Sequence, residues 1–187
     1  MKSKSFESHG NQGDGFLTAV NIRHVEEADL PALEWEGEYA HFRHLYADIF
    51  RRTQRNDAIM WLAELKDNHL IGQLFVQLSS GRPELADGYR RAYIYGFRVK
   101  PVFQNRGIGT RMMQVAETDL IQRGYRKITL NVGQDNQGAR RLYERLGYIV
   151  VTTDPGVWSY IDQYGQRQVV KEPAWRMEKQ LKSDVIS

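Results

Sequence analysis

Hydrophobic residues recur along this chain with two periods, one typical of strands and the other of helices. Apolar and polar residues alternate over residues 20–25, which predicts a strand. Asp29 and Pro31 are typical of a helix start, so we place the start of the first helix there. Residues 26–56 have helical spacing and predict two helices, with apolar positions Leu30 and Leu33 in the first, and Phe42, Leu45 and Ile49 in the second.

Three further strands are predicted in the middle of the chain. Residues 58–65 and 70–78 are rich in apolar residues, and the polar "KDNH" between them predicts a hairpin. A loop with many Gly, Pro, Ser and Asp residues follows over residues 79–90. Residues 92–99 are rich in aromatic and β-branched residues and predict the next strand.

The second half of the chain continues the alternation of helices and strands. A helix is predicted from Gly107 to about residue 122, with Gly124 as its C-terminal cap. A strand over residues 127–132 and a short helix over residues 136–147 follow. The segment "YIVVT" and residues 169–181 are expected to form the last two strands, and the aromatic stretch between them is expected to be rich in turns.

This order of elements predicts an α/β sandwich, in which helices cover a mixed sheet. We expect one domain over residues 19–182, between a flexible polar tail (1–18) and a C-terminal tail (183–187). The 187 residues include no cysteine, no segment resembling a signal peptide and no apolar run near the roughly 18 residues that span a bilayer. Disulfides, thiolate metal sites and a cysteine nucleophile are therefore excluded, and we expect a cytoplasmic protein without a membrane partner.

Positive charge is concentrated in one part of the chain. The net charge is +3, whereas residues 97–145 hold ten Lys/Arg and four Asp/Glu, an excess of six, so the remainder has an acidic excess of three. This distribution favours an anionic ligand for the basic part and a cationic partner for the remainder. The total excess is too small to favour nucleic acid, although Arg140, Arg141 and Arg145 make that a weaker alternative.

The segment "QNRGIGT", residues 104–110, has the composition of an anion-binding site. Gly107 and Gly109 begin the predicted amphipathic helix, where backbone N–H groups lack intrahelical partners and the helix dipole is positive. Glycine lets a phosphate oxygen approach these groups, while Arg106 and Thr110 add a charge and a hydroxyl. The alternative is a turn that needs glycine for its geometry alone. Dinucleotide and NTPase loops are disfavoured, because a methionine replaces the third glycine of the former and no Gly-Lys-Ser/Thr occurs.

A second motif lies within "NVGQDNQGARRLYERLGY", residues 131–148. Asn136, Ala139 and Tyr143 are three and four residues apart, so they share one face of the predicted helix and would line one groove. The alternative is a capping asparagine and a core tyrosine.

Together the two motifs resemble the GNAT superfamily of acetyl-CoA-dependent N-acyltransferases. The family's pyrophosphate loop has the form Gln/Arg-x-x-Gly-x-Gly/Ala, matched here by Gln104, Gly107 and Gly109. Its later helix carries Asn, Ala and Tyr before Leu-Gly-Tyr/Phe, matched by Asn136, Ala139, Tyr143 and residues 146–148. The resemblance in element order extends over about residues 20–181.

The resemblance implies a GNAT fold, with a mixed, mostly antiparallel sheet flanked by helices and splayed between its fourth and fifth strands. Coenzyme A lies in that gap in the family: the fourth strand holds the pantetheine arm and leaves an N–H for the thioester carbonyl. The glycine loop takes the pyrophosphate. The implied cofactor-binding residues are Phe97, Arg98, Val99, Gln104, Asn105, Arg106, Gly107, Gly109, Thr110 and Asn136. No metal is expected, because the spacing of the chain's histidines does not fit metal ligands.

Acyl transfer from a thioester to an amine needs a neutral amine, a donor for the oxyanion and a proton for the leaving thiolate. A tyrosine of pKa about 10 is protonated at neutral pH, so Tyr143 could supply the proton as a catalytic residue. Many family members carry a glutamate on the fourth strand, but Tyr93 and Tyr95 stand there in this chain. Three alternatives remain for the base: Glu64 acting through water, ordered water alone, or the acidic cluster of Glu34, Glu36 and Glu38.

We therefore predict an enzyme that moves an acetyl group from acetyl-CoA to a primary amine by direct attack in a ternary complex. The amine belongs to a small molecule, a peptide N-terminus or a lysine. The resemblance places the aromatic C-terminal region, including Trp158 and Tyr160, beside this acceptor. A non-catalytic acyl-CoA-binding module is the alternative, favoured by the missing glutamate and disfavoured by Tyr143. Members of the family often dimerise, so a homodimer is left open.

Overall fold

The computed structural model describes residues 12–182, so the predicted C-terminal tail and residues 1–11 of the predicted N-terminal tail lie outside the described residues. The strands are β1 Asn21–His24, β2 Ala58–Leu65, β3 His69–Gln77, β4 Arg91–Val99, β5 Lys127–Gly133, β6 Ile149–Asp154, β7 Val157–Ile161, β8 Arg167–Lys171 and β9 Ala174–Gln180. The α-helices are α1 Gln12–Thr18, α2 Arg43–Thr53, α3 Ile108–Gln122 and α4 Gln137–Arg145. Short 3₁₀ helices are η1 Glu27–Glu34, η2 Ala40–Phe42, η3 Lys66–Asn68 and η4 Pro101–Phe103.

Seven strands form one sheet in the order β1-β2-β3-β4-β5-β9-β6, and β7 and β8 form a separate hairpin. Neighbouring strands of the sheet are antiparallel, except that β4 and β5 are parallel. The predicted mixed, mostly antiparallel sheet is therefore confirmed.

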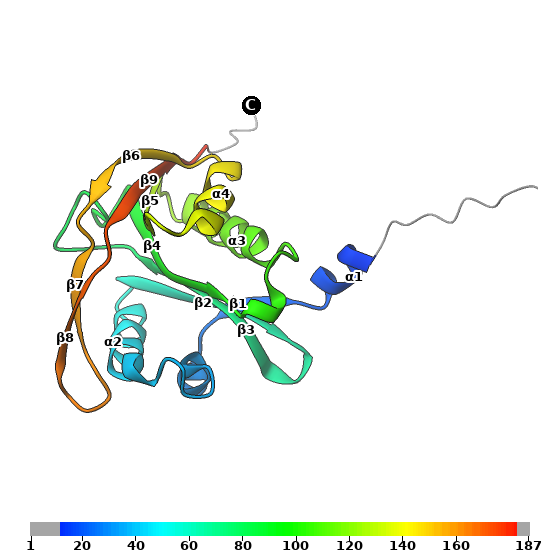
Figure 1. The fold of residues 1–187 in the computed structure, drawn as a ribbon. Coiled ribbons are helices and arrows are strands. Elements are labelled where there is room, and N and C mark those ends of the chain that lie inside the picture. Colours follow the sequence, from blue (N-terminus) through cyan, green and yellow to red (C-terminus); the bar gives the residue numbers. More distant parts are fainter. Residues whose placement is uncertain (1–11, 183–187) are drawn as a thin grey trace, which may run out of the picture.

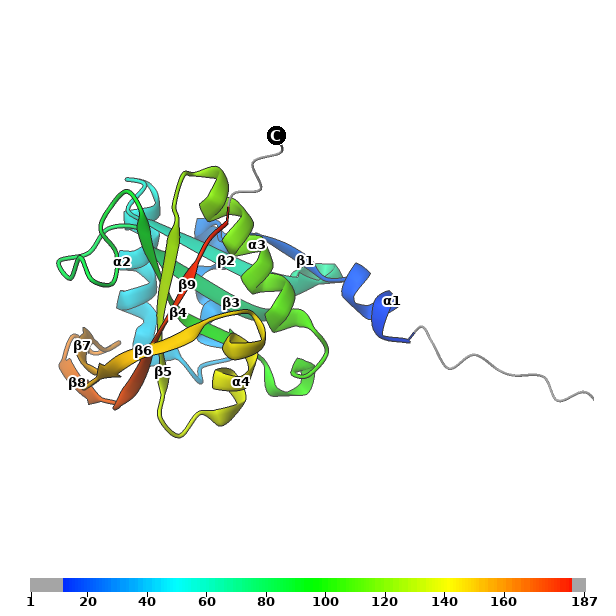
Figure 2. The same cartoon turned by 90° about the horizontal axis from the view of Figure 1, so that it is seen from above.

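Helices cover both faces of the sheet (Figures 1 and 2). On one face, α3 buries Ile108, Met112, Met113, Ala116 and Leu120, and this core also takes in Tyr143 of α4. On the other face, Tyr46 and Ile49 of α2 pack with Leu33 of η1 against strand residues such as Phe75. The helical spacing of these apolar residues is what turns one side of each helix towards the sheet.

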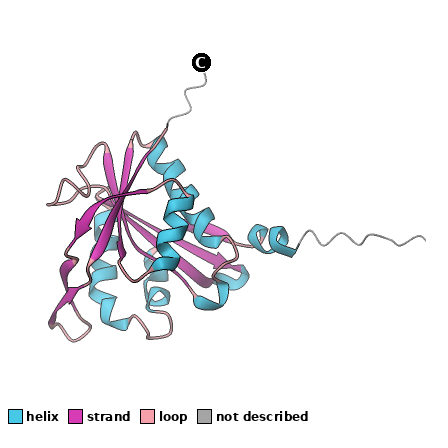
Figure 3. Cartoon of the chain, turned by 45° about the horizontal axis from the view of Figure 1, so that its top comes forward, coloured by secondary structure: helices cyan, strands magenta, loops and turns pink. Residues whose placement is uncertain are grey.

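The sheet opens between β4 and β5, as the divergence of the strands in Figure 3 shows. These strands are paired only from Arg91 to Ile94 on β4. Beyond Ile94, the register against β3 shifts by one residue, since Gln73 faces Arg98 while Phe75 faces Tyr95. Gly96 lies in this bulge with a φ of +59°, and a Cβ there would come within 2.6 Å of the Phe75 ring. Glycine therefore permits the bulge that separates β4 from β5.

Two helix ends that position the site follow from their sequence. Gly107 precedes α3 with a φ of +82°, a conformation that glycine adopts without steric cost. The N-cap of α4 is Asn136, whose Oδ1 accepts a hydrogen bond from the Ala139 N–H at 3.0 Å.

The prediction for the first helical segment was wrong in two respects. Residues 27–34 form the 3₁₀ helix η1 instead of an α-helix, and the helix begins two residues before Asp29. Asp29 acts from inside the first turn, where its carboxylate accepts a hydrogen bond from the Glu26 N–H at 2.7 Å. Pro31 lies inside η1, where its missing N–H disfavours a continuous α-helix.

The prediction for the C-terminal region was also wrong. Residues 169–181 do not form one strand, because the connection at Glu172 and Pro173 divides them between β8 and β9. The aromatic stretch predicted as turns contains β7, which pairs with β8 as a hairpin. Side-chain alternation in β7 was overlooked because the flanking glycines and Pro155 signal turns.

Part of the segment predicted as an N-terminal tail is helical. Helix α1 covers Gln12–Thr18 and extends away from the body of the molecule in Figure 1. Its Phe16 and Leu17 pack against the α3-side core. The single-domain assignment for residues 19–182 stays a prediction.

Candidate active site

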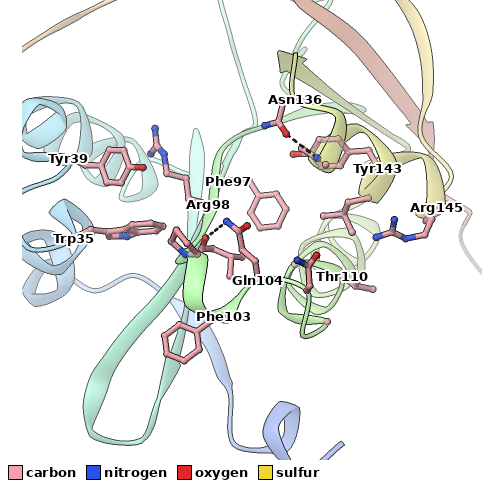
Figure 4. A pocket seen from close by; sticks show the side chains of 18 of the residues that line it. Trp35, Tyr39, Phe97, Arg98, Phe103, Gln104, Thr110, Asn136, Tyr143 and Arg145 are labelled. Carbon is pink, nitrogen blue, oxygen red and sulfur yellow. Dashed lines mark hydrogen bonds between the residues drawn. The ribbon is translucent and has the colours of Figure 1, made fainter. Parts of the chain in front are cut away.

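A cleft of about 520 Å³ lies where β4 separates from the sheet. One wall comes from the end of β4, the following loop and the first turn of α3, and another from α4. A third wall is formed by Trp35, Glu38 and Tyr39, far away in the sequence (Figure 4). All the predicted cofactor-binding residues line this cleft except Arg106.

The glycine loop leaves backbone open to the cleft. A Cβ on Gly109 would lie 3.3 Å from both Leu142 and Phe97, so a side chain here would fill the space between α3, α4 and β4. Gln104 fastens the loop to β4, because its Nε2 donates a hydrogen bond to the Val99 carbonyl at 2.9 Å. The described geometry therefore fits a pyrophosphate held by backbone N–H groups at the start of α3.

Tyr143 reaches the cleft from α4, opposite the side chain of Tyr39 (Figure 4). Its side chain is 7% exposed and packs against Phe97 and Tyr148, with ring centroids 6.4 and 5.9 Å away. Burial raises the pKa of the Tyr143 phenol above its ordinary value of 10.0, so the hydroxyl keeps its proton at neutral pH. This position is suited to a proton donor inside the cleft.

Arg106 does not line the cleft. Its guanidinium lies over the Phe16 ring of α1, 5.1 Å from the centroid. Helix α1 also contacts the neighbouring backbone, since Leu17 lies 3.1 Å from the position of a Cβ on Gly107. The arginine would have to leave Phe16 to reach a phosphate, so its cofactor role stays a prediction.

A second cavity, of about 470 Å³, lies on the α2 side of the sheet. Its lining includes the aromatic side chains of Phe42, Tyr46, Phe75, Tyr93, Tyr95 and Trp158. The rings of Tyr93 and Tyr95 are stacked with centroids 5.7 Å apart. Burial raises the pKa of Tyr93 to about 12, so this phenol is uncharged at neutral pH. Arg98 lines both cavities, so this residue near the end of β4 lies between them.

The negative charge of Asp154, which lines the second cavity, is compensated by neighbouring arginines. The Asp154 carboxylate accepts hydrogen bonds from Arg82 at 2.9 Å, from Arg176 and from the Gly156 N–H at 2.8 Å. Burial alone would raise the pKa of Asp154, but the N–H of Gly156 and the two guanidinium groups outweigh it and lower the pKa to about 2. Asp154 is therefore ionised at neutral pH and already bound by cations.

Glu64 does not lie at the site. Its carboxylate forms a bidentate ion pair with Arg23 at 2.9 Å, and it lines neither cavity. The Arg23 guanidinium lowers the pKa of Glu64, which weakens it as a proton acceptor. This placement argues against Glu64 as the general base of the reaction.

The three glutamates of the predicted acidic cluster, Glu34, Glu36 and Glu38, differ in their ion-pair partners. Glu34 is paired with Arg43 at 2.7 Å and Glu36 with Lys100 at 2.9 Å. Glu38 lines the cleft, and among the described residues that line it no other carboxylate is present. In the described part of the chain no three His, Cys, Asp or Glu side chains are grouped as metal ligands.

Several cleft residues were missed by sequence reasoning. Trp35 and Tyr39 complete the cleft from a segment about sixty residues before β4, and no local motif connects them. A sharp bend brings this segment to the cleft, since the three consecutive residues from Trp35 to Gly37 all have positive φ. The sequence around the bend does not predict this backbone conformation. Arg145 was noted for nucleic acid but lines the cleft instead.

Comparison with known proteins agrees with this geometry. Residues 22–148 match the acetyltransferase (GNAT) family. The chain belongs to this family. As a GNAT N-acetyltransferase it is an enzyme, and the fold predicted from its two motifs is confirmed.

Individual GNAT relatives are distant in sequence. The chain is 24% identical over 151 residues to an uncharacterized N-acetyltransferase, YycN, from Bacillus subtilis, covering 79% of this chain and 88% of that protein. The structure of Arabidopsis thaliana NAA60 in complex with acetyl-CoA is similar with a TM-score of 0.66 and 18% identity, covering 88% of this chain and 99% of the other. The Escherichia coli ribosomal-protein-S18-alanine N-acetyltransferase has a TM-score of 0.64 and 18% identity, covering 90% and 99%. No helix in the described range 12–182 is long and apolar enough to cross a membrane.

Proposed function

We propose that this enzyme transfers the acetyl group of acetyl-CoA to a primary amine by direct attack within a ternary complex. The observation that supports the proposal is that two cavities share Arg98 as a lining residue at the bulged end of β4. A donor in the cleft and an acceptor in the second cavity, which we call the acceptor cavity, would approach each other at Arg98, because this residue lines both. Such an arrangement supplies proximity without a covalent acyl-enzyme.

The cofactor contacts follow from the lining of the cleft. The backbone of Phe97 to Val99 would bond the pantetheine arm, and the loop from Gln104 to Thr110 would bind the pyrophosphate. Asn136 would contact the cofactor arm, although its Oδ1 already caps α4. Its amide nitrogen remains as a donor.

The chemical step requires little from side chains. The lone pair of the neutral amine attacks the thioester carbon, and a backbone N–H of β4 stabilises the oxyanion. Collapse breaks the C–S bond, and the Tyr143 hydroxyl donates its proton to the departing thiolate. The nitrogen releases its extra proton to Glu38 through water, and Glu38 holds that proton while the thiol departs. A water-bridged transfer from Glu38 restores the Tyr143 proton when the products leave.

The relatives do not decide among the three predicted acceptor classes, namely a small molecule, a peptide N-terminus and a lysine. The E. coli protein is named for an alanine of ribosomal protein S18. Membership of the N-acetyltransferase family argues against the non-catalytic alternative, although the fourth-strand glutamate is missing.

The experiment is a comparison of Tyr143→Phe with Tyr125→Phe. Both tyrosines are 7% exposed in the same core, but only Tyr143 lines the cleft. Release of free thiol from acetyl-CoA is followed with a panel of primary amines, and acetyl-CoA affinity is measured by calorimetry. We expect Tyr143→Phe to lower kcat about 100-fold with unchanged affinity, and Tyr125→Phe to keep kcat. Equal kcat values for the two variants would remove Tyr143 from the mechanism, and absence of acetyl-CoA binding would overturn the proposed function.

A further inference from the structure

The side chain of Arg98 is directed to the acceptor side of β4. Its guanidinium carbon lies 4.3 Å from the centroid of the Tyr39 ring and 5.3 Å from that of Phe42. One of its nitrogens donates to the Tyr46 hydroxyl at 3.5 Å. Figure 4 shows the guanidinium beside Tyr39, across the cleft from Tyr143. The aromatic contacts hold the group at the junction of the two cavities.

Arg98 lacks an anionic partner in the described part of the chain. None of the ion pairs found there, with a limit of 4.0 Å, includes it. The other arginine lining the acceptor cavity, Arg82, is paired with both Glu84 and Asp154. Asp154 in turn is bound by two arginines, so it is not available to Arg98.

This environment matches what a carboxylate needs. A guanidinium has five N–H donors in a planar fork that fits the two oxygens of a carboxylate. Stacking on Tyr39 occupies a face of the group and leaves donors at its edge. Arg98 is half-buried, which strengthens an ion pair relative to one in bulk water. The tyrosine hydroxyl at 3.5 Å satisfies at most one of the five donors.

We propose that the acceptor is an amino carboxylate, such as an α-amino acid with an apolar side chain, and that Arg98 binds its carboxylate. This inference rests on the proposed function and names its acceptor class. In an α-amino acid the amine and the carboxylate share one carbon, so both must lie near the reacting thioester. Arg98 occupies that position, and Tyr93, Tyr95 and Trp158 offer apolar surface for the side chain.

The same charge disfavours the other acceptor classes. A lysine side chain or a polyamine brings positive charge towards Arg98 without a carboxylate beside the amine, so the arginine would repel it. A peptide N-terminus presents a neutral carbonyl where the free amino acid has a carboxylate. An acid should therefore be a better substrate than its own amide.

The test uses matched acids and amides on the full-length protein. Acetylation of L-phenylalanine, L-leucine and L-methionine is compared with that of their amides and decarboxylated amines, at saturating acetyl-CoA. We expect the best acid to exceed its amide at least tenfold in kcat/KM. The amide group makes its amine less basic, which by itself favours the amide, so basicity cannot produce this preference.

Variants of Arg98 then test whether this residue causes the preference for the acid over its amide. Arg98→Gln should lower kcat/KM for the acid at least tenfold more than for the amide, whereas Arg98→Lys should retain part of the preference. Acetyl-CoA affinity of each variant, measured by calorimetry, shows that it is folded. Arg51→Gln is the control, because Arg51 is exposed on α2 and paired with Asp48 away from both cavities.

The outcomes separate this inference from the function on which it rests. If acetyl-CoA binds but no acid exceeds its amide, or if Arg98→Gln keeps the preference, the amino carboxylate is wrong and the enzyme remains. Tighter binding of succinyl-CoA than acetyl-CoA, lost in Arg98→Gln, would assign the carboxylate to the donor and also overturn the inference. Failure to bind acetyl-CoA would overturn both.

Discussion

The cofactor cleft and the acceptor cavity are assembled in different ways. Most of the cleft comes from one stretch of chain, from Phe97 to Arg145, and its proposed anion site consists of backbone at the start of α3. The acceptor cavity collects side chains from α2, β3, β4, β5, β6 and the β7–β8 hairpin. Backbone recognition requires glycines at set positions, which leave a motif in the sequence. Recognition by dispersed side chains leaves none.

The two regions also differ in how charge is arranged. The cleft offers helix N–H groups to an anion, whereas the acceptor cavity contains a pre-formed network around Asp154 and the unpaired Arg98. Changes on one side should therefore leave the function of the other intact. Variants on each side test whether the cleft and the acceptor cavity function separately.

Asp154→Asn should destabilise the protein without affecting acetyl-CoA affinity. Loss of the carboxylate leaves Arg176, whose side chain is 11% exposed, without an anionic partner, so we expect a loss of about 3 kcal/mol in the free energy of unfolding by urea. The pKa of Asp154 is lowered from 3.8 to about 2. Its stabilising effect is therefore present above about pH 4 and is lost as the pH falls towards 2, where wild type and variant should converge.

Asp48→Asn is the control for this experiment. Asp48 forms an exposed ion pair with Arg51, in which both side chains are more than half exposed, so its loss should cost less than about 1 kcal/mol. Similar losses for Asp154→Asn and Asp48→Asn would contradict a buried, stabilising network.

Gly109→Glu should strongly weaken cofactor binding and leave the fold intact. The new side chain would enter the space between Leu142 and Phe97 and bring a negative charge to the pyrophosphate site. We expect acetyl-CoA affinity, measured by calorimetry, to fall by about 100-fold, or roughly 3 kcal/mol. Gly81→Glu adds the same charge in a loop where a Cβ meets nothing within 4 Å, and it should bind normally. Equal affinities would show that the glycines serve only the turn.

Glu38→Gln should lower kcat by about tenfold at neutral pH, because the proton acceptor in the cleft is lost. The defect should diminish near pH 10, where hydroxide is available to take the proton that Glu38 accepts at neutral pH. Glu36→Gln is the matched control, since Glu36 is bound to Lys100. A defect in Glu38→Gln that is independent of pH would exclude the role of base.

Trp158→Ala should weaken acceptor binding alone. Trp158 packs on Phe42 and Tyr160, with ring centroids 6.0 and 5.4 Å away, and lines the acceptor cavity. We expect KM for the amine to rise about threefold to fivefold, equivalent to roughly 1 kcal/mol, while KM for acetyl-CoA is unchanged. Tyr164→Ala, in the same hairpin but 79% exposed, should have no effect. A rise in KM for acetyl-CoA would mean that the two regions are coupled.

Much of the fold could be predicted from local pattern. Alternation and helical spacing located β2, β3, β4, β5 and the helices α2, α3 and α4, because each element must turn one face towards the core. The errors arose where local signals compete. Pro31 allowed a helix start but sits inside the 3₁₀ helix η1, and the turn residues around β7 concealed its pairing with β8. Strand pairing depends on contacts with a distant partner, which a short window does not contain.

The family, the sheet and the position of the proposed anion site could all be predicted from the sequence, because glycines, an asparagine cap and apolar spacing act through neighbouring residues. Only the tertiary structure decided which charged groups reach the reaction. It paired Glu64 with Arg23 away from both cavities, placed Glu38 in the cleft and left Arg98 beside Tyr39 without an anion in the described residues. Side-chain charge acts across space over distances of a few ångströms, so its role depends on which distant segments the fold brings together.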